Sequence, residues 1–175
     1  MSVRDGLLAV LSLGPAYGLQ LHAEFTVRAP HRAALNVGQV YSTLDRASQS
    51  GLVCSAGTTL DGLPLFRLTE RGADRARQLM TVPSEGPASW TEMLDQVLIT
   101  TTVAPDRVTD LSRAYRRAWS ESEEQGPGAV ALATRLFSGA ATEWLTAVDQ
   151  SLAARDPIPL SPVRPRRGRR PAERG

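Results

Sequence analysis

The chain contains no lysine and only one cysteine. All 20 residues of the lysine and arginine class are arginines, and a GC-rich coding sequence is enough to explain this preference, so it carries no functional weight. A single cysteine, Cys54, excludes an intramolecular disulfide and suits a reducing compartment, which predicts a cytoplasmic protein. Cys54 stands in an apolar run, which favours a buried thiol over a redox sensor.

Long hydrophobic runs and the motifs of common enzymes are also missing. No apolar stretch approaches the ~20 residues that a membrane span needs, and the first residues lack a signal-peptide pattern, so we expect no membrane partner. There is no glycine-rich phosphate loop, no nucleophile elbow and no convincing carboxylate pair. His22 and His31 lack cysteines or carboxylates at zinc spacing. These absences predict a protein that is not an enzyme and holds no metal or cofactor.

What the chain does have is an uneven distribution of charge. Residues 1–80 hold eight arginines and six acidic residues, residues 81–155 hold six and ten, and residues 156–175 hold six and two. A basic end and an acidic middle predict that different segments meet different partners. The 175 residues are enough for one core, or for one small domain with a helical extension.

Residues 36–50 are predicted to form the helix around which the chain is organised. Asn36, followed three residues later by Gln39, is typical of a helix N-terminus, and Gly51 is typical of a C-terminal stop. One side of this helix is apolar, and the other carries short or forked side chains that donate and accept hydrogen bonds. Such a face suits a helix that reads base edges and phosphates in a DNA major groove, whereas the alternative is an ordinary solvated surface. Its residues are Gln39, Ser42, Thr43, Arg46 and Ser50.

The elements around this helix predict a mainly helical α+β fold with a small β-hairpin. Apolar spacing, and the breaks at glycine and proline, place two helices before it and two short strands after it. Three helices followed by a hairpin are the order of a winged helix-turn-helix, which we expect over residues 1–80 with the hairpin loop as the wing. The predicted helices are residues 3–14 and 17–29, the strands are residues 52–55 and 63–68, and the loop is residues 56–62.

The second half of the chain is predicted to be helical and then disordered. Its composition indicates a linker over residues 81–89, and three amphipathic helices within residues 90–155, with breaks at Pro105 and at residues 126–128. Proline, arginine and glycine dominate residues 156–175, which predicts a disordered tail. The apolar stripe of the last helix, expected over residues 129–155, includes Leu132, Leu136, Phe137, Ala140, Trp144, Leu145 and Val148.

Four short motifs lie in order along the first 80 residues. They are Leu8–Gly18, which ends in Gly-Pro-Ala-Tyr-Gly, then Gly38–Leu44, Ser50–Val53 and Arg67–Gly72. Together they resemble the opening helix and turn, the core of the recognition helix, the following strand and the wing exit of the PadR family of bacterial transcriptional regulators. The chain departs from the family pattern at Ser42, where proline is usual, and in its wing, which has few basic or aromatic residues.

The resemblance implies a homodimer held together by the C-terminal helices. It also implies binding to inverted repeats in promoters, usually as a repressor, and a small molecule that enters near the dimer interface and weakens DNA binding. Three helices within residues 90–155 resemble the longer-tailed subgroup of the family. These expectations make double-stranded DNA, a second copy of the chain and a small aromatic or hydrophobic effector the implied partners.

Candidate DNA contacts come from the polar helix face, the two helix junctions and the hairpin. Arg46 can meet a guanine bidentately or pair with a phosphate, and the sequence leaves both open. The two tyrosines can pack inward or turn their hydroxyls to phosphates. The wing loop itself carries no positive charge, so contact there is expected from Arg67 or from the backbone near Gly62. The full set is Tyr17, Asn36, Gln39, Tyr41, Ser42, Thr43, Arg46, Gly62 and Arg67.

Two further features each allow two interpretations. The aromatic residues Trp90, Trp119, Phe137 and Trp144 suit core or dimer packing better than an aromatic cage for a flat effector. The run Arg164–Arg170 suits a solvated tail better than a salt-sensitive phosphate contact. The poor wing also motivates an alternative function, in which the chain is a small-molecule sensor or protein-interaction module whose DNA binding is weak or lost.

Overall fold

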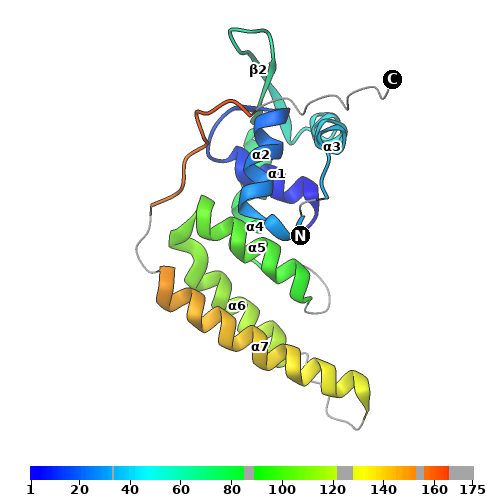
Figure 1. Cartoon of the computed structure of the whole chain (residues 1–175), viewed down its shortest axis with the longest axis vertical. Coiled ribbons are helices and arrows are strands. Elements are labelled where there is room, and N and C mark those ends of the chain that lie inside the picture. Colours follow the sequence, from blue (N-terminus) through cyan, green and yellow to red (C-terminus); the bar gives the residue numbers. More distant parts are fainter. Residues whose placement is uncertain (33, 85–88, 122–127, 153–155, 166–175) are drawn as a thin grey trace, which may run out of the picture.

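The computed structural model describes residues 1–32, 34–84, 89–121, 128–152 and 156–165. Within these ranges the chain is mainly helical and contains a three-stranded antiparallel sheet, which agrees with the expected mainly helical α+β class (Figure 1). The helices are α1 (Val3–Leu11), α2 (Gly18–Arg28), α3 (Val37–Gln49), α4 (Glu70–Leu79), α5 (Trp90–Val103), α6 (Val108–Glu121) and α7 (Ala129–Leu152), with 3-10 turns η1 (Pro30–Arg32) and η2 (Pro105–Arg107). The strands are β1 (Ala16–Tyr17), β2 (Val53–Thr58) and β3 (Pro64–Leu68).

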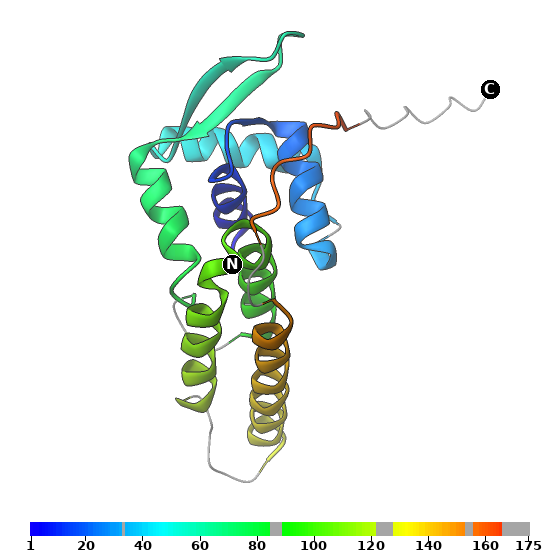
Figure 2. The ribbon, with the colours of Figure 1, turned by 90° about the vertical axis from the view of Figure 1, so that its left-hand side faces the viewer.

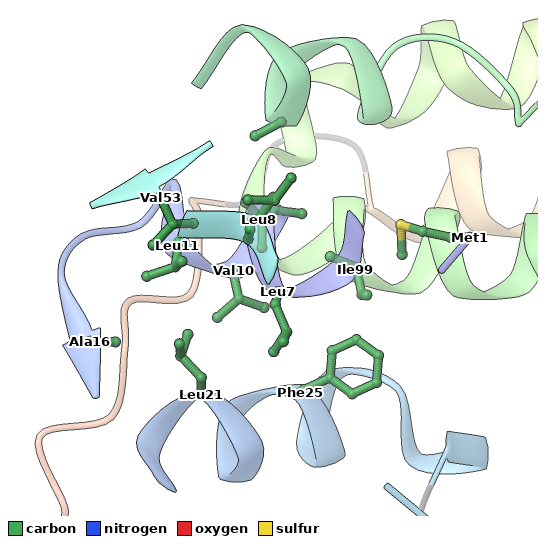
Figure 3. Close-up of a cluster of buried hydrophobic side chains, with 14 of the residues drawn as sticks. Met1, Leu7, Leu8, Val10, Leu11, Ala16, Leu21, Phe25, Val53 and Ile99 are labelled. Carbon is green, nitrogen blue, oxygen red and sulfur yellow. The ribbon is translucent and has the colours of Figure 1, made fainter. Parts of the chain in front are cut away.

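Helix α1 is the centre of the first core. Leu7 and Val10 are at most 1 % exposed, and Figure 3 shows them facing Leu21 and Phe25 of α2. Burial of such aliphatic side chains is the main favourable term in folding, at ~1.5–3 kcal/mol for each one that is fully buried. The helix ends earlier than the predicted residues 3–14, because the amides of residues 12–14 bond to carbonyls three positions back and turn the chain away.

The sheet contains one strand that the sequence did not predict. Its order is β1-β3-β2, all antiparallel, with Ala16 opposite Phe66 and Val53 opposite Leu68. Strand β1 has two residues, which is too short for an alternating pattern to appear in the sequence. Strand β2 is longer than expected and reaches Thr58, with an irregular register before its last residue.

The end of α3 is locked to the start of α4 by a close backbone contact. The Leu52 carbonyl accepts a hydrogen bond from the Thr69 amide at 3.0 Å, and the Thr69 hydroxyl donates to the Gly51 carbonyl at 2.7 Å. The same hydroxyl caps α4 by accepting from the Gly72 amide at 3.1 Å. A Cβ atom at Gly72 would overlap the Leu52 carbonyl oxygen, so glycine is required there. This contact fixes how the hairpin leaves α3.

The C-terminal helices form a second core at the other end of the molecule (Figure 2). Helices α6 and α7 lie side by side, and α5 joins them to the first core, to which Ile99 belongs. The predicted break at Pro105 is present as η2. The predicted linker is described only at residues 81–84 and 89, and most of the break at residues 126–128 lies outside the described residues. The second core contains Met93, Val97, Leu111, Tyr115, Trp119, Ala141 and Leu145.

The predicted disorder of the tail is wrong for residues 156–165, which we call the C-terminal segment. It runs beside α2 toward the sheet (Figures 1 and 2). The Ile158 amide donates to the Thr102 carbonyl at 2.8 Å, and the Ser161 amide donates to Glu24 Oε1 at 2.7 Å. Arg28 binds the Ile158 carbonyl at 3.0 Å. The composition of the segment could not predict this docking, because the docking depends on partners far away in the sequence. Residues 166–175 of the predicted tail lie outside the described residues.

Replacing Gly72 with alanine should lower the free energy of unfolding by about 1–3 kcal/mol, because the added methyl group cannot fit against the Leu52 carbonyl. Denaturant unfolding followed by circular dichroism measures this. The matched control is Gly139→Ala on α7, where no atom lies within 4 Å of the added Cβ. It should raise stability by about 0.5–1 kcal/mol, since alanine is the better helix former. Equal stability of Gly72→Ala and the parent protein would contradict the contact.

Candidate functional site

Helix α3 presents a polar face to solvent and an apolar face to the core. Val40, Leu44 and Ala47 are at most 2 % exposed, so the orientation of the helix is fixed by packing. Gln39, Ser42, Arg46 and Ser50 are exposed, as the sequence predicted. The same surface also carries Asp45 and Gln49, which were not predicted as contacts although their spacing places them beside the predicted residues.

Thr43 does not belong to this polar face. It is 5 % exposed, so its prediction as a surface contact is wrong. Its hydroxyl accepts a hydrogen bond from Arg46 Nη2 at 3.3 Å, and Arg46 Nε donates to the Ser42 carbonyl at 3.1 Å. Thr43 therefore helps to orient Arg46 from behind the face. Both bonds hold the arginine along its own helix.

Asn36 and Tyr41 fix the start of α3. Asn36 Oδ1 accepts from the Gln39 amide at 2.8 Å, so its side-chain oxygen is already used in capping the helix. The Tyr41 ring packs on Gly18, where an added Cβ would lie 2.5 Å from Tyr41 Cζ. Tyr17 is half-buried at the junction of β1 and α2. Two residues of the sequence motifs, Gly18 and Tyr41, thus meet where α2 begins.

The tip of the hairpin is acidic. Thr59 Oγ1 donates to Asp61 Oδ1 at 2.6 Å and accepts from the Leu63 amide at 2.9 Å, which closes the turn around Gly62 with its φ of +79°. The hydrogen bond from Thr59 lowers the pKa of Asp61, and the neighbouring Arg164 lowers it further. Arg67 is exposed lower on β3. The hairpin itself therefore offers one cation and one anion.

Helix α3 and the hairpin lie at the same end of the molecule (Figure 2). Exposed amide, hydroxyl and guanidinium groups on one helix can donate to and accept from the edges of base pairs, and Arg67 can approach a phosphate. Of the nine predicted contact residues, the described structure brings all but Thr43 to the exposed or half-buried surface of this end.

Three of the four predicted effector residues form a partly exposed aromatic group. The Trp90 ring centroid lies 6.4 Å from that of Phe137 and 6.0 Å from that of Trp144. Trp119 is 4 % exposed, and its indole nitrogen donates to Met93 Sδ at 3.2 Å. Trp119 therefore belongs to the core beneath this group, where a ligand could not reach it without opening the helices.

The predicted apolar stripe of α7 is buried along only part of its length. Leu145 is fully buried against α5 and α6, as expected. Toward the start of the helix, however, the structure leaves the stripe uncovered, with Leu132 50 % and Leu136 66 % exposed. The described residues of the chain therefore do not bury these two leucines.

Two adjacent residues of α5 join the two halves of the molecule. Asp95 is 1 % exposed and accepts hydrogen bonds from His31 Nε2 at 2.6 Å and from Arg32 Nη2 at 2.5 Å. The hydrogen bond between Asp95 and Arg32 raises the pKa of Arg32. Gln96, equally buried, donates to the Leu79 and Val82 carbonyls and accepts from Tyr115 Oη at 2.5 Å. Burial, in turn, raises the pKa of Tyr115 to about 12.

No family model matches the chain, and no curated protein matches it. Among the described residues, no group of three or more histidine, cysteine, aspartate or glutamate side chains is placed to hold a metal ion. None of the described helices combines the length and the hydropathy that crossing a membrane requires. A function must therefore be argued from the surfaces themselves.

Alkaline pH should destabilise the protein through Tyr115. Its folded-state pKa of about 12 lies above the ~10 of an unfolded tyrosine, so the folded state holds the proton more tightly. Stability is therefore unaffected below pH ~10 and falls by about 2 kcal/mol between pH 10 and 12. No lysine titrates in this range because the chain has none. Urea unfolding at several pH values should show a smaller alkaline loss for Tyr115→Phe, and an equal loss would contradict the assignment.

Proposed function

We propose that the chain is a PadR-like, winged helix-turn-helix transcriptional regulator that binds an inverted-repeat promoter site as a homodimer and acts as a repressor. The observation that carries this proposal is the exposed polar face of α3, held in place by the buried Val40, Leu44 and Ala47. In this proposal α3 enters the major groove and the β2–β3 hairpin is the wing. A surface helix of this width fits that groove, where each base pair presents a distinct pattern of donors and acceptors.

The contacts of the motif residues support the resemblance on which the proposal draws. Gly18 of the first motif packs on Tyr41 of the second motif. Gly72 of the fourth motif packs on Leu52 of the third motif. These contacts also help to fix the orientation of α3 relative to α2 and α4.

The uncovered part of α7 supports a homodimer. Exposed apolar patches of this kind are typical of surfaces that another protein covers. An inverted repeat requires two recognition helices related by a twofold axis, with half-sites about one helical turn apart, and one chain supplies a single α3. The exposed apolar residues are Val130, Leu132, Leu136 and Phe137.

A small aromatic or hydrophobic effector would bind near Trp90, Phe137 and Trp144. Their rings lie together beside the exposed residues of α7, so a flat molecule that stacks on them would also touch the proposed dimer interface. Quenching of tryptophan fluorescence by candidate compounds tests this part of the proposal.

One observation favours a second function. The acidic Asp61 at the hairpin tip is unsuited to a phosphate strand, which fits a sensor or protein-interaction module that has weak or lost DNA binding. The two functions differ in a titration of the purified protein against the duplex upstream of its own gene. Absence of any sequence-specific, salt-resistant complex favours the second function.

Replacing Arg46 with alanine should weaken binding to that upstream duplex by about tenfold, because a guanidinium that reads a base or holds a phosphate on α3 is lost. Fluorescence anisotropy with a labelled duplex measures the change. The control is Arg117→Ala, an exposed arginine on α6 at the opposite end. Unchanged affinity of Arg46→Ala would show that this face does not contact DNA.

Replacing both Leu132 and Leu136 with glutamate should convert the dimer into a monomer, since four charges would otherwise be buried without partners. Light scattering should then report about 18.8 kDa in place of twice that mass. Leu60→Glu is the matched control, because Leu60 is a fully exposed leucine on the hairpin. A parent protein that is already monomeric would contradict the dimer.

A further inference from the structure

The C-terminal segment ends beside the hairpin tip. Arg164 forms an ion pair with Asp61, and the two side chains are 54 % and 44 % exposed. The segment reaches this point because Gln20 and Glu24 of α2 bind the backbone of Ser161, at 3.0 and 2.7 Å. The contact therefore follows from a docked backbone and not from a chance encounter of two long side chains.

The ion pair places a positive charge, that of Arg164, at the tip of a hairpin that has none of its own there. Residues 56–63 contain no arginine, and their charged residue is Asp61. Asp61 is ionised at neutral pH, as an exposed aspartate is, and the hydrogen bond from Thr59 and the charge of Arg164 lower its pKa further. An ionised carboxylate at the tip would repel a phosphate strand, and protonation cannot relieve that repulsion near neutral pH.

We propose that the C-terminal segment is a structural part of the DNA-binding face, in which Arg164 neutralises Asp61 and so allows the hairpin tip to approach the phosphate backbone of duplex DNA. This inference rests on the proposed function. It explains how a hairpin without its own tip cation can serve as a wing, because the cation comes from the far end of the chain.

The location of the segment supports this role. It lies along α2, and its last described residues reach the end of the molecule that carries α3 and the hairpin (Figures 1 and 2). Glu24 and Arg28, which anchor it, have side chains that are 9 % and 3 % exposed and pair with each other at 2.8 Å. Anchors this deeply buried hold the segment in one place, so the charge of Arg164 is delivered to one position.

The test is a set of single and double variants of the full chain, titrated against the upstream duplex by fluorescence anisotropy. Arg164→Ala should weaken binding about two- to fivefold, and the loss should shrink as salt is added. Arg164→Lys keeps the charge and should bind nearly as the parent does. Asp61→Asn should bind at least as well as the parent, and Asp61→Asn with Arg164→Ala should restore near-parent affinity, because no charge is left to neutralise.

The matched control is Arg113→Ala on α6. Arg113 is also 54 % exposed and also pairs with an exposed aspartate, Asp110, but at the opposite end of the molecule. Its replacement should leave DNA binding unchanged. This comparison separates an effect at the hairpin tip from the general loss of one positive charge.

Three results would overturn the inference. Equal weakening by Asp61→Asn and Arg164→Ala, without rescue in the double variant, would show that the pair matters only as a structural tie. Tighter binding by Arg164→Ala would show that the segment masks the face. Unchanged binding by Arg164→Ala would show that the tip does not approach DNA. A parent protein that binds no duplex removes the proposed function as well, whereas each of the other results leaves it standing.

Discussion

The position of α3 depends on two close approaches made at glycines. At one end the Tyr41 ring packs on Gly18, and just beyond the other end the Leu52 carbonyl packs on Gly72. A side chain at Gly72 would push the hairpin away from α4, and a side chain at Gly18 would displace the Tyr41 ring. Because the apolar face of α3 is also fully buried, the helix has no freedom to rotate. The direction of its polar face, on which the proposed function rests, is thus fixed by the buried apolar face and by close contacts near both ends of the helix.

The two halves of the molecule are joined by buried polar contacts as well as by apolar packing. Asp95 and Gln96 of α5 form hydrogen bonds with η1 and with the residues after α4. The same helix contributes Ile99 to the first core and Met93 to the second. The C-terminal segment adds a second connection, from Thr102 at the end of α5 along α2 to the hairpin. A ligand or partner that shifts α5 or α7 would therefore move groups tied directly to the proposed DNA-binding end. Such shared elements are what coupling between two sites requires.

The helices and the hairpin could be predicted from the sequence because they leave local signals. Periodic apolar residues, a capping asparagine and punctuating glycines all belong to the segments they describe. What could not be predicted depends on distant partners. Thr43 resembles its exposed neighbours in chemistry, although its spacing from Val40 and Ala47 is that of a core-facing position, and it is buried. Strand β1 exists because β3 lies beside it, and the leading part of the α7 stripe is exposed because the other described residues do not cover it.

The C-terminal segment shows most clearly why composition was insufficient. Leu160 packs against the first core, but Ile158 and Val163 stay 55 % and 74 % exposed, so the docking depends also on backbone groups that meet Glu24 and Arg28. Burying that ion pair would be costly if the charges lost water without replacement. Instead, the Thr102 and Ile158 carbonyls accept from the guanidinium and the Ser161 amide donates to the carboxylate, so both charges keep hydrogen-bond partners. The pair and the segment are thus complementary: the segment supplies hydrogen-bond partners to the buried charges, and these charges, together with the packing of Leu160, hold the segment in place.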